Sequence, residues 1–237
     1  MNEVLRALYE ACPKLTPAYI SDVLGLHDER ARRVAEITGG ISRDEADMLG
    51  AVVREVKPIH SLEVGLGYGF SAIAICDAAY QDAPGRRHIV IDPHQTKYWN
   101  GTGLKNLSDA GYEPCIDFYE QPSYRCLPEL EQKGTQIDFA FVDGWHTFDY
   151  AFVDFFYIDK MLREGGVIAF DDADWPSIRP IIRYIVTNLP YRIVRTMPEK
   201  KEREPIDIEL GIEGSCIALR KERATSEREI FFHKAFF

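Results

Sequence analysis

The apolar positions of the 237-residue chain fall into short continuous runs and longer stretches with helical spacing. The clearest unit spans residues 137–176. Ile137–Val142 is a run of β-branched and aromatic residues typical of a buried strand, and residues 148–162 have helical spacing. Gly165-Gly166 is expected to stop that helix before a second strand over residues 167–170. The pattern predicts a parallel strand–helix–strand unit whose two strands end at the same sheet edge.

Short apolar runs and stretches with helical spacing also alternate before and after residues 137–176, which predicts an α/β fold. Before the first expected strand, a helix opens with a capping-box pattern at Ser42 and Glu45. Residues 197–214 are charged and contain two prolines, which indicates an exposed loop or hairpin. Other strands are expected at 59–64, 88–91, Ile116–Tyr119, 191–195 and 215–219, and other helices at 28–38, 71–79, 94–111, around 127–130 and at 175–189. The expected parts are an N-terminal helical region, a main domain and an aromatic tail, at residues 1–56, 57–220 and 221–237.

A glycine-rich turn follows the first expected strand. Gly65 and Gly67 stand between this strand and a helix, where glycine lets the backbone approach a ligand. Phe70 occupies the third-glycine position of the dinucleotide fingerprint, which disfavours a pyrophosphate-binding dehydrogenase. Glu63 puts a carboxylate at the turn and favours an amine-bearing ligand. Asp92, which ends the next strand, is placed to accept hydrogen bonds from a ribose, although an Asp-Pro pair also starts turns.

Further polar side chains stand where later strands end. Asp143 follows one strand of the 137–176 unit, and Asp171 and Asp172 follow the other. If the strands are neighbours, the three carboxylates converge at the ligand-binding edge of the sheet, and a cation is expected among them. The alternative for the Asp171-Asp172 pair is a turn and helix cap. Ser123, after the third strand, is either near a bound base or an N-cap.

The composition limits the classes of partner. Hydrophobic residues make up 46% of the chain, charged residues 28%, and the net charge is -10, which argues against a nucleic-acid or anionic-membrane surface. No apolar run is long enough for a membrane span, and no secretory signal is expected. Five dispersed cysteines fit reduced thiols in a cytoplasmic protein. The apolar tail is expected to pack on its own domain or, alternatively, to form a contact in a homo-oligomer.

The motifs LEVGLGYG, VDGWH and FDDADWP, with the acid that ends the second strand, resemble those of class I S-adenosylmethionine-dependent methyltransferases. The likeness is to the metal-dependent small-molecule O-methyltransferases, which include catechol and macrolide-sugar enzymes, and it covers about residues 42–220. It implies a Rossmann-like, doubly wound, seven-stranded sheet with an antiparallel last strand. It also implies that the methionine end of S-adenosylmethionine is surrounded by Glu63, Gly65, Gly67 and Ser71, the ribose is held by Asp92, and the adenine lies near Ser123.

By the same resemblance, Asp143, Asp171 and Asp172 are expected to bind Mg²⁺ or another divalent cation. Catechol enzymes have a lysine where His146 stands, whereas sugar-modifying relatives tend to have histidine. Among sugar, polyketide and catechol-like hydroxyls, the resemblance therefore favours a non-catechol acceptor. The expected activity is metal-assisted O-methylation of a small hydroxylated acceptor, with His146 as general base, unless this histidine is structural. The alternatives are a catalytically silent S-adenosylmethionine-binding protein and a nucleotide-dependent oxidoreductase.

Three aromatic residues near these motifs are open to two interpretations. Trp145, Tyr150 and Trp175 either line the acceptor pocket or, as aromatic residues beside buried strands more often do, belong to the core.

Overall fold

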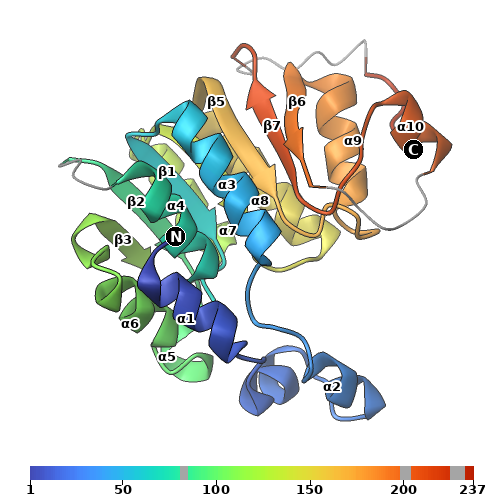
Figure 1. Cartoon of the computed structure of the whole chain (residues 1–237). Helices are drawn as coiled ribbons and strands as arrows, with labels where there is room; N and C mark the ends of the chain where they lie inside the picture. Colours follow the sequence, from blue (N-terminus) through green and yellow to red (C-terminus); the bar gives the residue numbers. More distant parts are fainter. Residues whose placement is uncertain (81–84, 198–203, 225–232) are drawn as a thin grey trace.

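A computed structural model describes residues 1–80, 85–197, 204–224 and 233–237 (Figure 1). Its strands form one seven-stranded sheet in the order β3-β2-β1-β4-β5-β7-β6. The bounds are β1 His60–Val64, β2 Arg87–Ile91, β3 Ile116–Tyr119, β4 Ile137–Val142, β5 Leu162–Phe170, β6 Tyr191–Thr196 and β7 Ile217–Lys221. Strands β1 to β5 pair in parallel, whereas β7 is antiparallel to both β5 and β6. The predicted mostly parallel sheet with an antiparallel last strand is confirmed.

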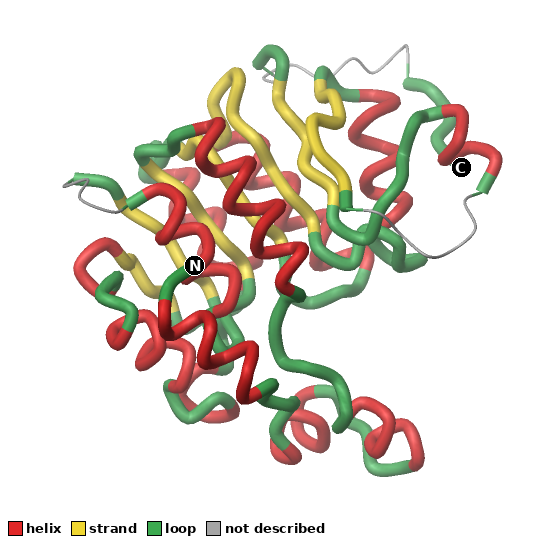
Figure 2. Tube along the Cα trace, in the orientation of Figure 1, coloured by secondary structure: helices red, strands yellow, loops and turns green. Residues whose placement is uncertain are grey.

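Helices bury both faces of the sheet (Figure 2). One face packs against α3 and α4, and the other against α7, α8 and α9. The bounds of these helices are Arg43–Val56, Phe70–Ala79, Ser123–Gln132, Phe148–Met161 and Arg179–Asn188. Along β4, Phe139 and Phe141 belong to the first layer, whereas Ala140 and Val142 belong to the second. The continuous apolar run of β4 follows from this burial on both sides.

Shorter elements lie around this three-layer body. They are α1 Glu3–Ala11, the π-helix η1 Tyr19–Val23, α2 Glu29–Val34, α5 Gln95–Tyr98, α6 Thr102–Asp109, the 3₁₀ helix η2 Glu113–Cys115 and α10 Pro205–Glu209. In Figure 1, α2 lies apart from the sheet, whereas α1 lies beside α4. Among the described residues, no helix combines the length and apolar character needed to cross a membrane.

Several predicted boundaries were wrong. Helix α2 ends at Val34 and not at residue 38, β7 begins at Ile217 and not at residue 215, and three larger errors follow. Helix α8 ends at Met161 and continues directly into β5, so Gly165-Gly166 lies inside the strand. A Cβ atom on Gly166 would come 2.7 Å from Leu162 Cδ1, 2.9 Å from the Arg163 carbonyl oxygen and 3.0 Å from the Asp138 carbonyl oxygen on β4, so crowding within β5 and against β4 explains this glycine. The predicted helix over 94–111 is two helices, separated where Asn100 and Gly101 both have positive φ.

The third of the larger errors concerns α9. It begins at Arg179, after turns in which the Trp175 N–H donates to the Asp172 carbonyl (2.8 Å). Pro180, and not Pro176, therefore occupies the first turn of the helix, where a missing N–H is tolerated.

The C-terminal tail is described only in part. The ring of Phe236 lies 5.4 Å from that of Tyr184 on α9, so this residue packs on its own domain as predicted. Phe237 is 87% exposed. Residues 230–232 of the predicted apolar tail lie outside the described residues, as do residues 198–203 of the predicted loop. A subunit contact through the tail stays a prediction.

The strand order places a topological switch point between β1 and β4. The chain leaves β1 towards β2 on one side, while β4 and β5 lie on the other. In open α/β sheets, ligands bind beyond the carboxyl ends of the strands at such a point. The glycine turn after β1 and the carboxylates after β4 and β5 therefore lie at this edge.

Candidate functional site

The glycine turn touches the end of β4. Gly65 has a φ of 94°, and a Cβ atom there would overlap the carbonyl oxygen of Asp143. Gly67 and Gly69 also have positive φ, and α4 begins directly after Gly69 with Phe70 and the buried Ser71. Glycine at position 65 is therefore required both by backbone conformation and by close approach. The missing side chain at Gly65 thus lets the turn pack against the Asp143 backbone at the ligand-binding edge of the sheet.

Asp92 holds this turn in place. Its Oδ2 accepts hydrogen bonds from the N–H groups of Leu66 (3.1 Å) and Gly67 (3.0 Å), and from the Gln95 side-chain amide (3.0 Å). Its Oδ1 accepts from the His94 N–H (2.7 Å). A carboxylate offers about four lone-pair sites, so the chain itself engages most of this acceptor capacity. Asp92 thus orders the glycine turn, a role missed by sequence reasoning, and its contact with a ribose stays a prediction.

Glu63 lies beneath the turn with no exposed surface. Neither of its carboxylate oxygens has a hydrogen-bond partner among the described residues, and Nε2 of the buried His88 is 3.6 Å from Oε2. The side-chain oxygen Oε1 of Gln95, beside Asp92, is also buried without a partner. Buried polar groups normally find partners. Two side chains with unsatisfied acceptor oxygens near one turn fit a ligand that carries hydrogen-bond donors.

Carboxylates and one imidazole gather after β4 and β5. The carboxyl groups of Asp143 and Asp171 are hydrogen-bonded to each other. His146 bridges the group: its Nε2 is 3.5 Å from Oδ1 of Asp143, and its Nδ1 is 3.4 Å from Oδ2 of Asp172. The three carboxylates thus meet at one edge as the strand pattern predicted, and His146 lies between two of them. Asp172 is held there by a backbone with a φ of 48°.

Burial, and then mutual repulsion, shift the titration of the two hydrogen-bonded acids. Burial and the Asp172 charge raise the pKa of Asp143 well above its usual range. Burial and the Asp143 charge do the same to the pKa of Asp171. Two adjacent carboxylates in a recessed site resist double ionisation, which a nearby cation would relieve.

Glu45 joins this cluster from α3 and was expected only to cap that helix. The capping box is confirmed, because Oε2 of Glu45 accepts from the Ser42 N–H (2.7 Å) and Oγ of Ser42 accepts from the Glu45 N–H (3.3 Å). Glu45 is also hydrogen-bonded to Asp171 and raises its pKa. A cavity of about 370 Å³ borders Glu45, with Phe70 and Ile41 in its wall. No local pattern could have revealed this contact, which depends on how α3 packs over β5.

The carboxylates and His146 form a candidate donor set for a metal ion. Among the residues that the structure describes, no group of three or more His, Cys, Asp and Glu side chains is arranged to hold a metal ion. Asp143 and Asp171 face each other, whereas the Asp172 carboxylate faces His146. Chemically, the cluster supplies the oxygen ligands that Mg²⁺, Ca²⁺ and Mn²⁺ prefer. The donor chemistry therefore fits a hard divalent cation, and the three-carboxylate site stays a prediction.

His146 is recessed but accessible, with 28% of its side chain exposed. Burial lowers its pKa, which favours the neutral imidazole that can accept a proton. Its carbonyl accepts from the Ser177 hydroxyl (2.7 Å), and its ring lies 5.4 Å from that of Trp175. Trp175 is 42% exposed and Tyr150 is 36% exposed, so the interpretation of these two aromatic residues as core was wrong.

The N-terminal region reaches the same edge through Tyr19. The Tyr19 ring packs against those of His94 (5.7 Å) and Trp99 (4.9 Å). Burial and the charges of Asp92 and Asp143 raise the pKa of Tyr19 to about 12, so its phenol lies in the field of both acids. No local sequence pattern singled out this tyrosine.

Ser123 lies at the start of α7, where Pro122 is the N-cap residue, so the N-cap interpretation of Ser123 was wrong. Its hydroxyl is hydrogen-bonded to Asp154 of α8, which is fully buried and whose Oδ1 has no partner among the described residues. A contact between Ser123 and adenine stays a prediction.

Asp154 makes protein stability depend on pH. Burial raises its pKa to about 7, against about 4 in the unfolded chain. Between these values the folded state holds a proton that the unfolded state has lost, so this contribution to stability is lost as pH rises towards 7. Asp154→Asn should therefore raise the free energy of unfolding by roughly 1–3 kcal/mol at pH 8, and much less at pH 5. Urea denaturation of the wild-type and variant proteins at pH 5 and pH 8 measures this change in the free energy of unfolding. An equal change at the two pH values would contradict a raised pKa of Asp154.

The chain was compared with known proteins. Residues 62–173 match the protein family described as "Methyltransferase domain". Tapetum-specific methyltransferase 1 of Arabidopsis thaliana is 30% identical over 137 residues, which are 57% of this chain and 56% of that protein. Caffeoyl-CoA O-methyltransferase of Pinus taeda is 26% identical over 157 residues, which cover 61% of this chain and 56% of that protein. The matches thus span little more than half the length of these curated relatives.

Solved structures agree in fold over most of the chain. The O-methyltransferase TomG of Streptomyces achromogenes, in complex with S-adenosylmethionine, superposes with a TM-score of 0.63 at 16% identity, covering 94% of this chain and 91% of that one. An O-methyltransferase of Bacillus cereus, in complex with S-adenosylhomocysteine, superposes with a TM-score of 0.63 at 18% identity, covering 86% of this chain and 96% of that one.

The sheet and its glycine turn are those of a class I methyltransferase fold. The resemblance to the S-adenosylmethionine-dependent O-methyltransferases, inferred from the motifs, is thereby confirmed.

Proposed function

We propose that the protein is an S-adenosylmethionine-dependent O-methyltransferase that acts on a hydroxyl of a small molecule with the help of a divalent cation. One observation carries the proposal: the glycine turn after β1 contacts Asp143, which stands in a cluster with Asp171, Asp172 and His146. A cofactor-binding turn and a recessed acidic cluster thus adjoin each other. Methyl transfer needs this proximity, because donor and acceptor must be held in line.

Cofactor binding is assigned to the turn and its surroundings. S-adenosylmethionine supplies a methyl group on a sulfonium centre, which an acceptor oxygen displaces in line. The backbone of the turn at Gly65 and Gly67 is assigned to its methionine part, with Ser71 at the following helix. The unsatisfied Glu63 carboxylate is suited to an amine, and Asp92 to a ribose if its Oδ1 accepts one more hydrogen bond. Ser123 is assigned to the adenine side.

Activation of the acceptor is assigned to the carboxylates and His146. A divalent cation bound by Asp143, Asp171 and Asp172 would lower the pKa of a coordinated hydroxyl. His146 is held between two of these carboxylates and is biased towards its neutral form. It would take the acceptor proton as the new carbon–oxygen bond forms, and the neighbouring carboxylates would stabilise the resulting imidazolium. The acceptor class that we infer is a sugar, polyketide or catechol-like hydroxyl.

Calorimetry tests the class of protein. We expect S-adenosylhomocysteine to bind with a dissociation constant on the order of 1 μM, equivalent to about −8 kcal/mol, with and without Mg²⁺. NAD⁺ should show no binding under the same conditions. Absence of S-adenosylhomocysteine binding in both would overturn the proposal, and NAD⁺ binding would favour an oxidoreductase. Binding without methyl transfer to sugars, polyketides and catechols would instead indicate a catalytically silent relative.

A further inference from the structure

Two cysteines from distant parts of the chain pack into the same apolar cluster, away from the proposed active site. Cys76, near the end of α4, is fully buried, and Cys115, the last residue of η2, is half-buried. Cys115 packs against the buried apolar cluster that contains Cys76, and the Tyr112 hydroxyl donates to Asp77, the residue after Cys76 (3.0 Å). Cys115 immediately precedes β3, whose other end faces the ligand-binding edge. The pair thus connects the helix after the glycine turn with the amino end of an outer strand.

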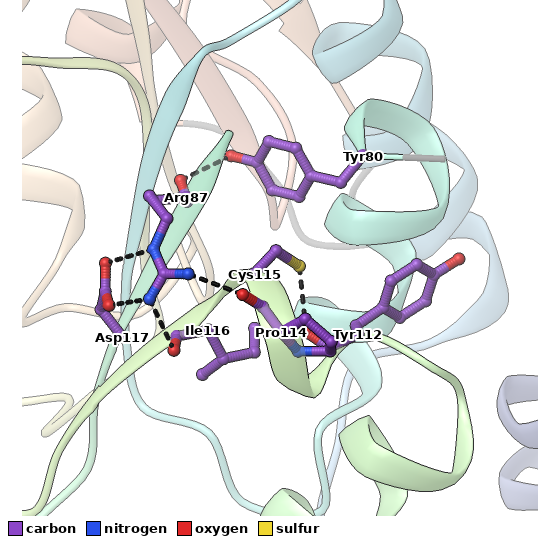
Figure 3. A network of polar contacts seen from close by, with 7 residues as sticks. All are labelled: Tyr80, Arg87, Tyr112, Pro114, Cys115, Ile116 and Asp117. Carbon is purple, nitrogen blue, oxygen red and sulfur yellow. Dashed lines mark hydrogen bonds and ion pairs between the residues drawn. The ribbon is translucent and has the colours of Figure 1, made fainter. Parts of the chain in front are cut away.

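The backbone around Cys115 is held on both sides by one arginine (Figure 3). The Arg87 guanidinium donates to the carbonyl oxygens of Pro114 (2.6 Å) and Ile116 (3.2 Å) and pairs with Asp117. The Cys115 thiol itself donates to the Tyr112 carbonyl (3.0 Å). Cys115 is therefore presented to Cys76 in a fixed position and not on a free loop.

The two thiols differ in reactivity. The contact with Cys76 and the nearby Arg87 charge lower the pKa of Cys115, whereas burial raises the pKa of Cys76 well above its usual range. The thiolate is the reactive form of cysteine, and oxidation also requires access to the oxidant. Cys115 has both properties, and Cys76 stands directly behind it. This is the arrangement of a reacting thiol and a resolving thiol.

We propose that Cys115 and Cys76 form an oxidisable dithiol site that reacts with hydrogen peroxide. In the first step the Cys115 sulfur attacks one peroxide oxygen; the oxygen–oxygen bond breaks, Cys115 becomes a sulfenic acid and one water leaves. In the second step the Cys76 sulfur attacks the Cys115 sulfur; the sulfur–oxygen bond breaks and a second water leaves. Two thiols are oxidised to one disulfide while one peroxide is reduced to two waters, and a thiol reductant reverses the change.

The site is tested in the full-length Cys12→Ser protein, because Cys12 is exposed and would react separately. After treatment with peroxide and alkylation of the remaining thiols, peptide mapping without reduction should show the Cys76 and Cys115 peptides joined. The melting temperature should rise by about 5 °C or more and return after reduction, because the link closes a loop of roughly 40 residues. Cys126→Ser, which removes another buried thiol, should leave the link unchanged.

Cys76→Ser in the same background separates the two steps. With no resolving thiol, Cys115 should stop at the sulfenic acid and be captured by dimedone. Peroxide treatment that leaves Cys115 reduced, or that carries it to a sulfinic acid without a link to Cys76, would overturn the proposal. If Cys76→Ser fails to fold, the peptide map of the Cys12→Ser protein still decides. None of these readouts depends on the proposed methyltransferase activity.

Discussion

Replacing Asp143 with alanine should abolish Mg²⁺-stimulated methyl transfer, with a loss on the order of 100-fold or more. The carboxylate is the central member of the cluster, hydrogen-bonded to Asp171 and in contact with His146. Binding of S-adenosylhomocysteine should change little, because the substitution keeps the backbone that contacts Gly65. Initial rates with and without Mg²⁺, together with calorimetry, measure both quantities. Unchanged Mg²⁺-stimulated turnover would refute the metal-binding role.

Stability provides the folding control for this variant. Asp143 is a recessed acid whose pKa is raised by burial and by the charge of Asp172, so its ionised form opposes folding. Asp143→Ala measured without metal at neutral pH should therefore melt no lower than the wild-type protein. A large drop in melting temperature would mean that lost turnover reports misfolding and not a lost ligand.

His146→Gln is the matched comparison. It removes the proposed base while keeping Asp143 and Asp172. We expect a lower rate at neutral pH that is still stimulated by Mg²⁺, with a deficit that shrinks as pH rises and solvent takes over the proton. The metal-binding role and the general-base role are separated if Asp143→Ala loses only the stimulation by Mg²⁺ and His146→Gln loses only rate. An unaffected rate in His146→Gln would make this histidine structural.

Gly65→Ala should be the most damaging single substitution in the turn. The new Cβ would overlap the Asp143 carbonyl oxygen, and the φ of 94° disfavours any L side chain. The neighbouring backbone cannot easily move away, because the Asp143 N–H donates to the Val64 carbonyl (2.9 Å). We expect the free energy of unfolding to fall by about 3–5 kcal/mol, within the range of overpacked or strained core sites.

Gly111→Ala is the control for Gly65→Ala. Gly111 also has a positive φ, at 84°, but a Cβ there would have no neighbour within 4 Å. Its substitution carries the conformational cost alone, about 1–2 kcal/mol. Urea denaturation measures the loss in free energy of unfolding for each variant, provided that the dependence on urea concentration is the same in both. The difference between the two losses is the cost of the overlap with the Asp143 carbonyl. Equal losses would show that the turn yields to the added methyl group and that its contact with β4 is loose.

Much of the fold was predictable because its determinants are local. Strand β4 was predicted with its observed bounds, since an apolar strand covered on both faces leaves an unbroken run of hydrophobic residues. The capping box located the start of α3 from two residues. Boundaries failed where a long-range contact replaced the local rule. Gly166 serves the close packing of β4 and β5, so its presence was mistaken for a helix stop.

The candidate site divides in the same way. The sequence by itself determined that Asp143 and the Asp171-Asp172 pair would meet at one edge, because a parallel crossover brings adjacent strand ends together whatever surrounds them. Only the tertiary structure decided that Glu45 joins this cluster from α3, that Tyr19 packs over the edge, and that Asp92 binds the glycine turn. Such contacts join residues far apart in the chain, and they depend on how whole helices pack, which no local pattern of residue types encodes.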